Sequence, residues 1–327
     1  GYLVIAERSV SATYPVINNG TLAGGGFDNI VTKLNATGTA LIGSKKIGGS
    51  GDDGVNISAT RGLSSLQRNY GDDGRSEVIL DGGGNVYVAS CTKSPGSGTP
   101  LAGAFPVTTG AFQTAFGGGS QDGVVLKLAP DLSTLTFASF LGGSANDAAY
   151  VLSLGPGGDI YVAGGTESSN LPGNTTGTVG TSNNGNVDGF ISVISNNGAA
   201  ISRTAYIGTP AFDQVFGIQF DNKGFPYIMG QTTGNWTVRN AAYSNTGGKQ
   251  FIAKLQPDLS AFVYSTAFGS AGAPTPNISP IAFLVDRCEN VYVSGWGGGI
   301  NIEKGYPSAG TAGMPEVTPL TGIPGAD

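Results

Sequence analysis

The sequence predicts an all-β protein, a β-propeller of four-stranded antiparallel blades, and three observations carry this prediction. The chain has 327 residues, of which 56 are glycine and only 12% are charged, where about 25% charged residues is usual. A turn followed by a strand recurs along the chain. No helical periodicity of useful length competes with the strand pattern.

The recurring turn and strand read LDGGGNVYVAS at 80–90 and return as LGPGGDIYVAG, FDNKGFPYIMG and VDRCENVYVSG. Their tyrosines are 74, 66 and 65 residues apart, at Tyr87, Tyr161, Tyr227 and Tyr292. The opening residues GYLVIA fit the same position. A period of tens of residues indicates a repeat architecture. Gly and Asn in the turn are expected to supply the positive φ angles of a tight hairpin.

Each repeat is expected to contain four strands. An apolar first strand such as SEVILD (76–81) precedes the turn, and the tyrosine strand is the second. DGVVLKL (122–128) typifies the third strand and LTFASFLGG (135–143) the fourth. Gly, Asn, Asp and Pro separate the strands. Four strands in each repeat favour propeller blades, with the first strand innermost, over the alternatives of a sandwich or a solenoid.

The repeats predict a single propeller domain over 1–327 with about five blades at least partly represented. The expected units are a partial blade 1–53, blades 76–147, 148–213 and 214–276, and a partial blade 277–327. A four-bladed ring closed by the termini would leave the strand ENVYVSG without a place. We therefore expect the chain to be part of a longer protein whose ring has six to eight blades.

The long segments of the repeats all lie between second and third strands, at 8–26, 91–121, 165–187 and 231–248. In a propeller, these loops and the connections between blades emerge on one face. Loops held by a rigid scaffold are the usual place for binding. This face is therefore the expected functional surface.

The combined motifs resemble the bacterial β-propeller repeats called SBBP repeats. These motifs are D-x-x-G-N-x-Y-V, FPVTTGAFQ, D-x-x-x-x-K-L and S-x-x-G-G-S-x-x-D. The best copy is 76–147, and its matching positions are Asn85, Phe105, Pro106, Asp122, Lys127, Leu128, Gly142, Gly143 and Asp147. The copy at 285–302 is similar to those of large Bacteroidetes surface proteins. The resemblance implies secretion or cell-surface display through the type IX system, alongside adhesive domains.

Charge and residue content argue against several functions. The net charge is −6 with a pI near 4.6, and the 16 basic residues are scattered, whereas nucleic-acid binding relies on clustered Lys and Arg. The chain has no histidine, the usual general base of hydrolases and the commonest zinc ligand. No apolar run of 18 residues is present. We expect no nucleic-acid partner and no membrane insertion.

The two cysteines, Cys91 and Cys288, are too few for a disulfide scaffold. A bond between them is compatible with the sequence but not implied by it. The alternative is that both are buried free thiols.

Two aspartate-rich turns are the candidate metal sites. GSGDDGVN carries Asp52 and Asp53, and YGDDGRS carries Asp72 and Asp73. Clustered carboxylates suit Ca²⁺, but neither turn has the spacing of a calcium loop, and Asp beside Gly is a common turn former. Structural turns are favoured, and no other cofactor is expected.

Two further sets of aspartates recur with the repeat and are expected to cap loops or accept backbone N–H bonds. Equal recurrence in several blades argues for a scaffold role, because a catalytic group needs to occur only once. The sets are Asp53, Asp147 and Asp213, and Asp28, Asp122 and Asp188.

Trp236 and Trp296 follow second strands near the loop-bearing face. Each is expected either to bind a sugar or protein partner or to fill a gap between blades. An enzyme would need a carboxylate pair or a Tyr–Arg pair, and no local motif supplies one.

The predicted function is therefore a non-catalytic, secreted or cell-surface module for adhesion or protein interaction. Its expected partners are other protein domains, surface proteins and glycans. A carbohydrate-active enzyme, either a glycoside hydrolase or a polysaccharide lyase, is the alternative, and a pure spacer is a third possibility. An asymmetric Tyr–Arg or two-carboxylate cluster at one end of the channel would favour the enzyme.

Overall fold

The computed structural model describes residues 1–17, 21–22, 24–58, 66–69, 71–96, 103–303 and 305–315. Within these ranges the chain is all-β, as the sequence predicts. Helical structure in the described residues is limited to a 3₁₀ turn, Asp72–Gly74, and a short helix α1, Gly299–Glu303. In the same ranges, no helix has the length and apolar character needed to cross a membrane.

The described strands form five sheets that follow one another along the chain. The first sheet contains β1 (Leu3–Ser9), β2 (Thr21–Leu22), β3 (Asp28–Leu34) and β4 (Leu41–Ile47). The second contains β5 (Glu77–Leu80), β6 (Val86–Thr92), β7 (Asp122–Leu128) and β8 (Leu135–Leu141). The third contains β9 (Asp147–Leu154), β10 (Ile160–Thr166), β11 (Asp188–Ile194) and β12 (Ile201–Ile207). The fourth contains β13 (Asp213–Phe220), β14 (Pro226–Thr232), β15 (Gln250–Leu255) and β16 (Phe262–Phe268). The fifth contains β17 (Ser279–Val285) and β18 (Val291–Trp296).

The second, third and fourth sheets are four-stranded antiparallel meanders whose strands pair in chain order. The first sheet has the order β1-β3-β4-β2, and β2 pairs parallel to β4. This extra strand belongs to the segment 8–26, which the sequence predicts to be a loop. Thr21 and Leu22 pair with Lys46 and Ile47 at the outer edge.

The tight turns before the tyrosine strands owe their shape to one residue with positive φ. Gly84, Gly158 and Gly224 have φ angles of 82°, 88° and 87°, which glycine adopts at little cost. In the last copy Glu289 takes this position with φ 66°. Asparagine plays a different role from the expected one, because the Asn85 side chain donates to Asp81 Oδ2 at 2.7 Å.

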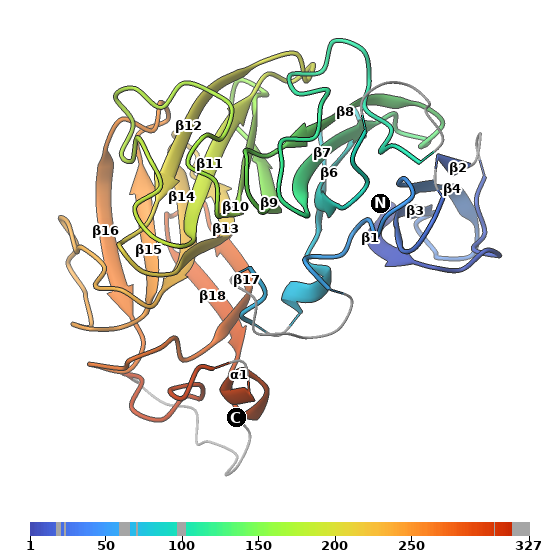
Figure 1. The fold of residues 1–327 in the computed structure, drawn as a ribbon. Coiled ribbons are helices and arrows are strands. Elements are labelled where there is room, and N and C mark those ends of the chain that lie inside the picture. The colour runs from blue at the N-terminus through green and yellow to red at the C-terminus, as the bar shows by residue number, and fades with distance from the viewer. Residues whose placement is uncertain are drawn as a thin grey trace.

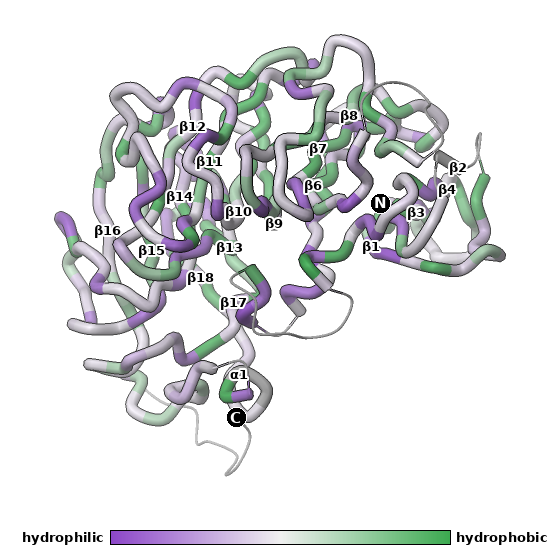
Figure 2. Tube along the Cα trace, in the orientation of Figure 1, coloured by the Kyte–Doolittle hydropathy of each residue, from purple (hydrophilic) through white to green (hydrophobic). Residues whose placement is uncertain are grey.

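The cores lie between successive sheets. One apolar cluster joins the first and second sheets through residues such as Val31 and Phe140. A second joins the second and third sheets, and a third joins the third and fourth sheets. Figure 1 shows the sheets following one another along an arc, and Figure 2 shows hydrophobic segments gathered in the strands.

The pairing register corrects one alignment. In the second sheet Tyr87 lies opposite Lys127, and in the first sheet the residue opposite the equivalent Lys33 is Val4. GYLVIA therefore fits the repeat with Val4, not Tyr2, at the tyrosine position. The Lys33 ammonium still lies 4.4 Å from the centre of the Tyr2 ring, so a tyrosine contacts the lysine from a neighbouring position.

The links between sheets lie beside the starts of the long loops. The same backbone bond recurs, from Lys93 N to Asp52 O at 3.0 Å and from Glu167 N to Asn146 O at 2.9 Å. Thr233 N donates to Phe212 O at 2.9 Å in the next sheet. The long loops and the links between sheets therefore share one face, called the loop face below.

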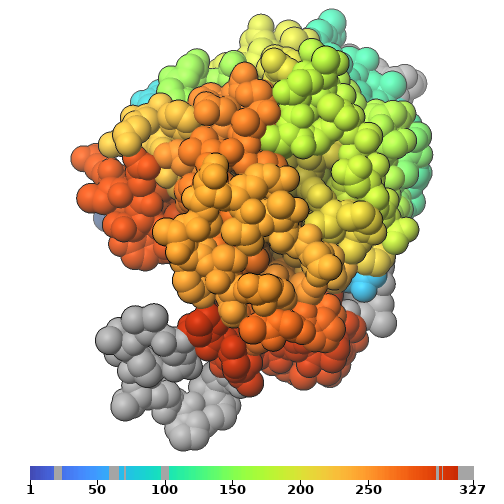
Figure 3. Space-filling view, turned by 90° about the vertical axis from the view of Figure 1, so that its left-hand side faces the viewer, coloured from blue at the N-terminus to red at the C-terminus, as the bar shows by residue number. Residues whose placement is uncertain are grey.

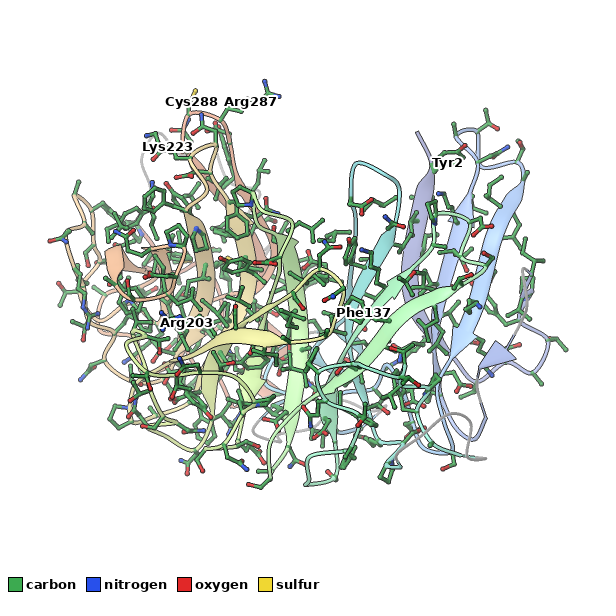
Figure 4. All side chains as sticks on the ribbon, turned by 90° about the horizontal axis from the view of Figure 1, so that it is seen from above. Tyr2, Phe137, Arg203, Lys223, Arg287 and Cys288 are labelled. Carbon is green, nitrogen blue, oxygen red and sulfur yellow. The ribbon has the colours of Figure 1, made fainter. Side chains whose placement is uncertain are left out.

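Figure 4 shows the tight turn that carries Arg287 and Cys288 at an outer end of the molecule, beside Lys223.

The cysteines are not joined. Cys91 is buried in β6 and Cys288 is exposed in the turn between β17 and β18, and both are free thiols. Burial raises the pKa of Cys91 to about 12. The expectation of buried free thiols is right for Cys91 and wrong for Cys288.

Candidate functional site

The base of the loop face is fixed by one buried aspartate at each of the first three links between sheets. Asp147, the first residue of β9, accepts a hydrogen bond from Gly143 N at 2.7 Å and one from Ser168 Oγ at 2.8 Å. It also accepts a hydrogen bond from Thr166 Oγ1. The side chain thereby ties the link before the third sheet to the loop after β10.

The same arrangement recurs at the neighbouring sheets. Asp53 accepts from Gly49 N at 2.7 Å and Ser94 Oγ at 2.9 Å. Asp213 accepts from Thr209 N at 2.7 Å and Thr209 Oγ1 at 2.8 Å. The prediction that the recurring aspartates accept backbone N–H bonds is confirmed for these three residues.

A second carboxylate lies close to each of these anchors. Asp122, the first residue of β7, accepts from Gly117 N at 2.6 Å through Oδ2, while its buried Oδ1 has no hydrogen-bond partner among the described residues. A Cβ atom on Gly142 would lie 2.3 Å from that oxygen. Glycine at this position therefore makes room for the carboxylate of Asp122.

Burial raises the pKa of these carboxyl groups. It raises the pKa of Asp53, Asp122 and Asp188 to about 7, and the nearby carboxylates of Asp28, Asp147 and Asp213 respectively add to the rise. Burial also raises the pKa of Asp147 and Asp213 to about 6. Desolvation of the charged form outweighs the hydrogen bonds that favour it.

The two calcium candidates Asp52 and Asp53 bind different partners in the protein. Asp53 is the buried anchor already described. Asp52 accepts from Phe27 N at 3.1 Å and lies 3.8 Å from the Lys93 ammonium. Both side chains therefore contact protein donors.

The other candidate pair, Asp72 and Asp73, is also bound by protein groups. Asp72 is buried and accepts from Arg68 N at 2.9 Å and Asn69 N at 2.7 Å. Asp73 pairs with Arg8 at 2.8 Å. In the part of the chain that the structure describes, no group of three or more Asp, Glu, His or Cys side chains is placed to hold a metal ion.

Trp236 fills a gap in the loop face. Its ring stacks on Phe251 with centroids 3.8 Å apart and an interplanar angle of 4°, and it meets Phe262 edge-on at 6.2 Å. A pocket of about 80 Å³ beside it is lined by the loops of the third and fourth sheets. This volume is too small for a sugar ring, because ligand pockets measure about 300–1,000 Å³. Of its two expected roles, the structure favours gap filling.

Replacing Trp236 with alanine is expected to lower the free energy of unfolding by about 2 kcal/mol. Truncation of a fully buried tryptophan costs about 3–5 kcal/mol, and this ring is only partly buried. Urea denaturation followed by circular dichroism measures the change. The control is Val238→Ala in the same loop, where the side chain is 40% exposed and the change should stay within about 0.5 kcal/mol.

Trp296, the last residue of β18, is 48% exposed. It ends the last strand of the fifth sheet, whereas Trp236 packs on Phe251 and Phe262 of the fourth sheet. Other side chains of the fifth sheet are also exposed, among them Ile281, Leu284 and Tyr292.

The centre of the arc contains a polar network that the sequence does not reveal. The hydroxyl of Tyr150 donates to Leu66 O at 2.9 Å and accepts from Gln214 Nε2 at 2.9 Å. Gln231 continues the network, donating to Gln214 Oε1 at 3.1 Å and to Tyr306 OH at 2.8 Å. These side chains come from segments far apart in the chain, and only the fold brings them together.

Beside this network lies a cavity of about 110 Å³ lined by Arg75, Glu77, Tyr150, Phe216 and Phe283, among others. The Arg75 guanidinium lies 4.5 Å from the Phe216 ring centre and 3.2 Å from Asp72 Oδ1. Glu77 accepts from Leu152 N at 2.7 Å, and burial raises its pKa to about 7. This is an asymmetric Tyr–Arg–Glu cluster of the kind that would favour an enzyme.

The groups of this cluster are nevertheless engaged by the protein. Burial raises the pKa of Tyr150 well above its ordinary value, so its hydroxyl is a poor general base near neutral pH. Asp72 is fully buried beneath Arg75. Glu77 is therefore the carboxylate of this cluster that reaches the cavity.

Sequence reasoning missed Arg75 and Glu77. The available signal was their place at the start of the innermost strand of a repeat, with Arg75 just before β5 and Glu77 as its first residue. Charged residues there are rare in this chain, because the equivalent stretches before β9 and β13 carry no basic residue.

No protein-family model matches this chain, and no curated protein matches it.

Proposed function

We propose that the five sheets are blades of a β-propeller of the SBBP-repeat type and that the protein is a non-catalytic binding module. The support for a propeller is the repetition of sheets in chain order, with an apolar core between each successive pair of the first four sheets. The tyrosine strand occupies the second position in the second to fifth sheets.

One observation carries the binding role. The bases of the loops are held by repeat-equivalent buried aspartates, exemplified by Asp147, whereas the loops themselves differ in length and sequence. A constant scaffold with variable loops is the usual arrangement of a recognition surface. Rigid loop bases also reduce the ordering cost of binding.

The proposed setting is secreted or displayed on the cell surface. Partners on this proposal are surface proteins, neighbouring protein domains or glycans, contacted through Gly-, Ser-, Thr- and Asn-rich loops. Figure 3 looks onto one side of the molecule, where the fourth sheet and its loops occupy the centre of the view. Exposed apolar residues on the loop before β15 include Val238 and Tyr243, 40% and 53% exposed.

A binding screen with matched variants tests the loop-face proposal. The wild-type protein is applied to a glycan array and to an array of bacterial surface proteins. Val238→Ser combined with Tyr243→Ser is expected to weaken the hits at least tenfold. The control Leu80→Ser removes an apolar residue that is 44% exposed beside a tight turn, away from the long loops.

The proposal requires that the Leu80→Ser variant keep wild-type binding. An absence of any hit, or an equal loss in both variants, contradicts a binding role for the loop face. Circular dichroism spectra of all three proteins establish that the comparison is between folded molecules.

One observation, the environment of Glu77, favours the alternative of a carbohydrate-active enzyme. A carboxyl group with a pKa near 7 in a cavity that also holds Arg75 has the properties of a general acid. A panel of polysaccharides is incubated with the wild type, with Glu77→Gln and with the exposed control Glu303→Gln. Turnover that is lost only in Glu77→Gln supports the enzyme, and no turnover by the wild type supports the binding module.

A further inference from the structure

The fifth sheet exposes a strand that its equivalents bury. β6, β10 and β14 are buried at every residue, whereas every residue of β18 is partly buried or exposed. Tyr292 is 54% exposed, while the equivalent Tyr87 and Tyr227 are 0% and 1% exposed. Among the described residues, β18 pairs only with β17.

The other sheets show what covers this position. β7 pairs with β6 so that Lys127 lies opposite Tyr87, and β15 pairs with β14 so that Lys254 lies opposite Tyr227. In both sheets the lysine ammonium lies 4.9 Å from the tyrosine ring centre. In these two sheets the second strand therefore receives a third strand whose lysine packs on the tyrosine, whereas in the third sheet a valine of β11 takes the place of the lysine.

The turn aspartate provides the complementary charge. Asp221 pairs with Lys254 at 2.7 Å, and its equivalent in the fifth sheet is Asp286. Asp286 Oδ2 accepts from Tyr292 OH at 3.2 Å. Hydrogen bonds, first of all from Asn290, hold the pKa of Asp286 below its ordinary value. No Lys or Arg of the described residues forms an ion pair with Asp286.

Apolar side chains surround this open edge. Ile281 and Leu284 on β17 are 55% and 52% exposed, and Trp296 on β18 is 48% exposed. Exposed apolar side chains beside an unpaired strand edge are typical of an interaction site. Figure 4 shows Arg287 and Cys288 at the tip of the turn between these strands, pointing outward.

We propose that β18 is a docking edge for an extended partner segment that pairs antiparallel with it. The segment has the composition of β7, with apolar residues along the strand and a lysine near its C-terminal end. That lysine lies over Tyr292 and beside Asp286, as Lys254 lies over Tyr227 and beside Asp221. Main-chain hydrogen bonds hold the segment, and the lysine fixes its register. This inference does not depend on the function of the loop face.

The test uses a synthetic fluorescein-labelled peptide with the sequence of residues 119–130, which includes β7. Binding to the whole chain is measured by fluorescence anisotropy. Tyr292→Ala is expected to weaken binding about fivefold, the loss of one exposed cation–π contact of about 1 kcal/mol. The control Tyr2→Ala alters another exposed tyrosine that packs on a lysine and should bind as the wild type does.

Two altered peptides define the mode of binding. Lys127→Glu in the peptide reverses the charge that faces Asp286 and is expected to weaken binding at least tenfold. Val125→Pro removes a strand hydrogen bond and should reduce binding below detection. In a Trp236→Phe background, the fluorescence of Trp296 should shift to shorter wavelength when the original peptide binds.

Three results would overturn the proposal. The first is no binding of the original peptide, and the second is equal binding to wild type and Tyr292→Ala. The third is dimerisation of the wild type in sedimentation velocity that Tyr292→Ala abolishes and the peptide does not compete. That outcome assigns the edge to a second copy of this chain.

Discussion

Replacing Asp147 with alanine is expected to lower the free energy of unfolding by about 4 kcal/mol at neutral pH. The change leaves the N–H of Gly143 and the hydroxyls of Thr166 and Ser168 without their acceptor. Each unsatisfied buried donor costs about 1–3 kcal/mol. Urea denaturation of the two proteins measures the difference.

The matched control is Asp159→Ala, in the exposed turn of the same sheet. Its unfolding free energy should change by less than about 0.5 kcal/mol. Limited proteolysis locates the effect, since the Asp147 variant should be cut first in the loop between β10 and β11. Equal stability of the two variants would contradict an anchoring role for Asp147.

The unfolding free energy is expected to fall as pH rises from about 4 to about 8. The folded state holds the pKa of Asp53, Asp122 and Asp188 near 7, whereas an unfolded aspartate titrates near 3.9. The folded state therefore binds more protons in this window, and this contribution to stability is lost as pH passes through the raised pKa values. Urea midpoints recorded at several pH values across the window measure the slope.

Asp122→Asn should flatten this pH dependence. The amide oxygen still accepts the hydrogen bond from Gly117, but the buried charge beside Asp147 is gone. The variant is expected to exceed the wild type in stability at pH 8 and to match it only below about pH 4, where the aspartate of the unfolded chain is protonated as well. A profile parallel to that of the wild type would show that Asp122 does not titrate in this range. Asp159→Asn, at an exposed position, serves as the control.

The repeat could be read from the sequence because its signals are local. The turn glycines, the tyrosine strand and the alternating strands are defined by residues close together in the chain, and Gly84, Gly158 and Gly224 take the expected positive φ. The anchoring role of Asp53, Asp147 and Asp213 was also predictable, because equal recurrence indicates scaffold chemistry. The sequence could not decide whether Trp236 binds a partner or fills a gap, because local sequence does not determine which neighbouring side chain a ring packs on.

Other features depended on contacts between distant segments. The parallel strand β2 exists because Thr21 and Leu22 pair with Lys46 and Ile47 of β4. The cluster around Glu77 and Tyr150 exists because first strands of different sheets converge on one cavity. The exposure of Tyr292 follows from the strand pairing around it. The sequence could not predict this exposure, because Tyr87 and Tyr227 lie in the same motif and are buried.

The sequence by itself determined the all-β class, the four-strand repeat and the aspartates that hold its loops, because turn geometry and strand periodicity are encoded over a few adjacent residues. Only the tertiary structure decided which side chains meet at the centre of the arc and which strand edge stays open. Burial and pairing are properties of the assembled sheets. Similar local motifs therefore become a buried core strand in β6 and an exposed edge in β18.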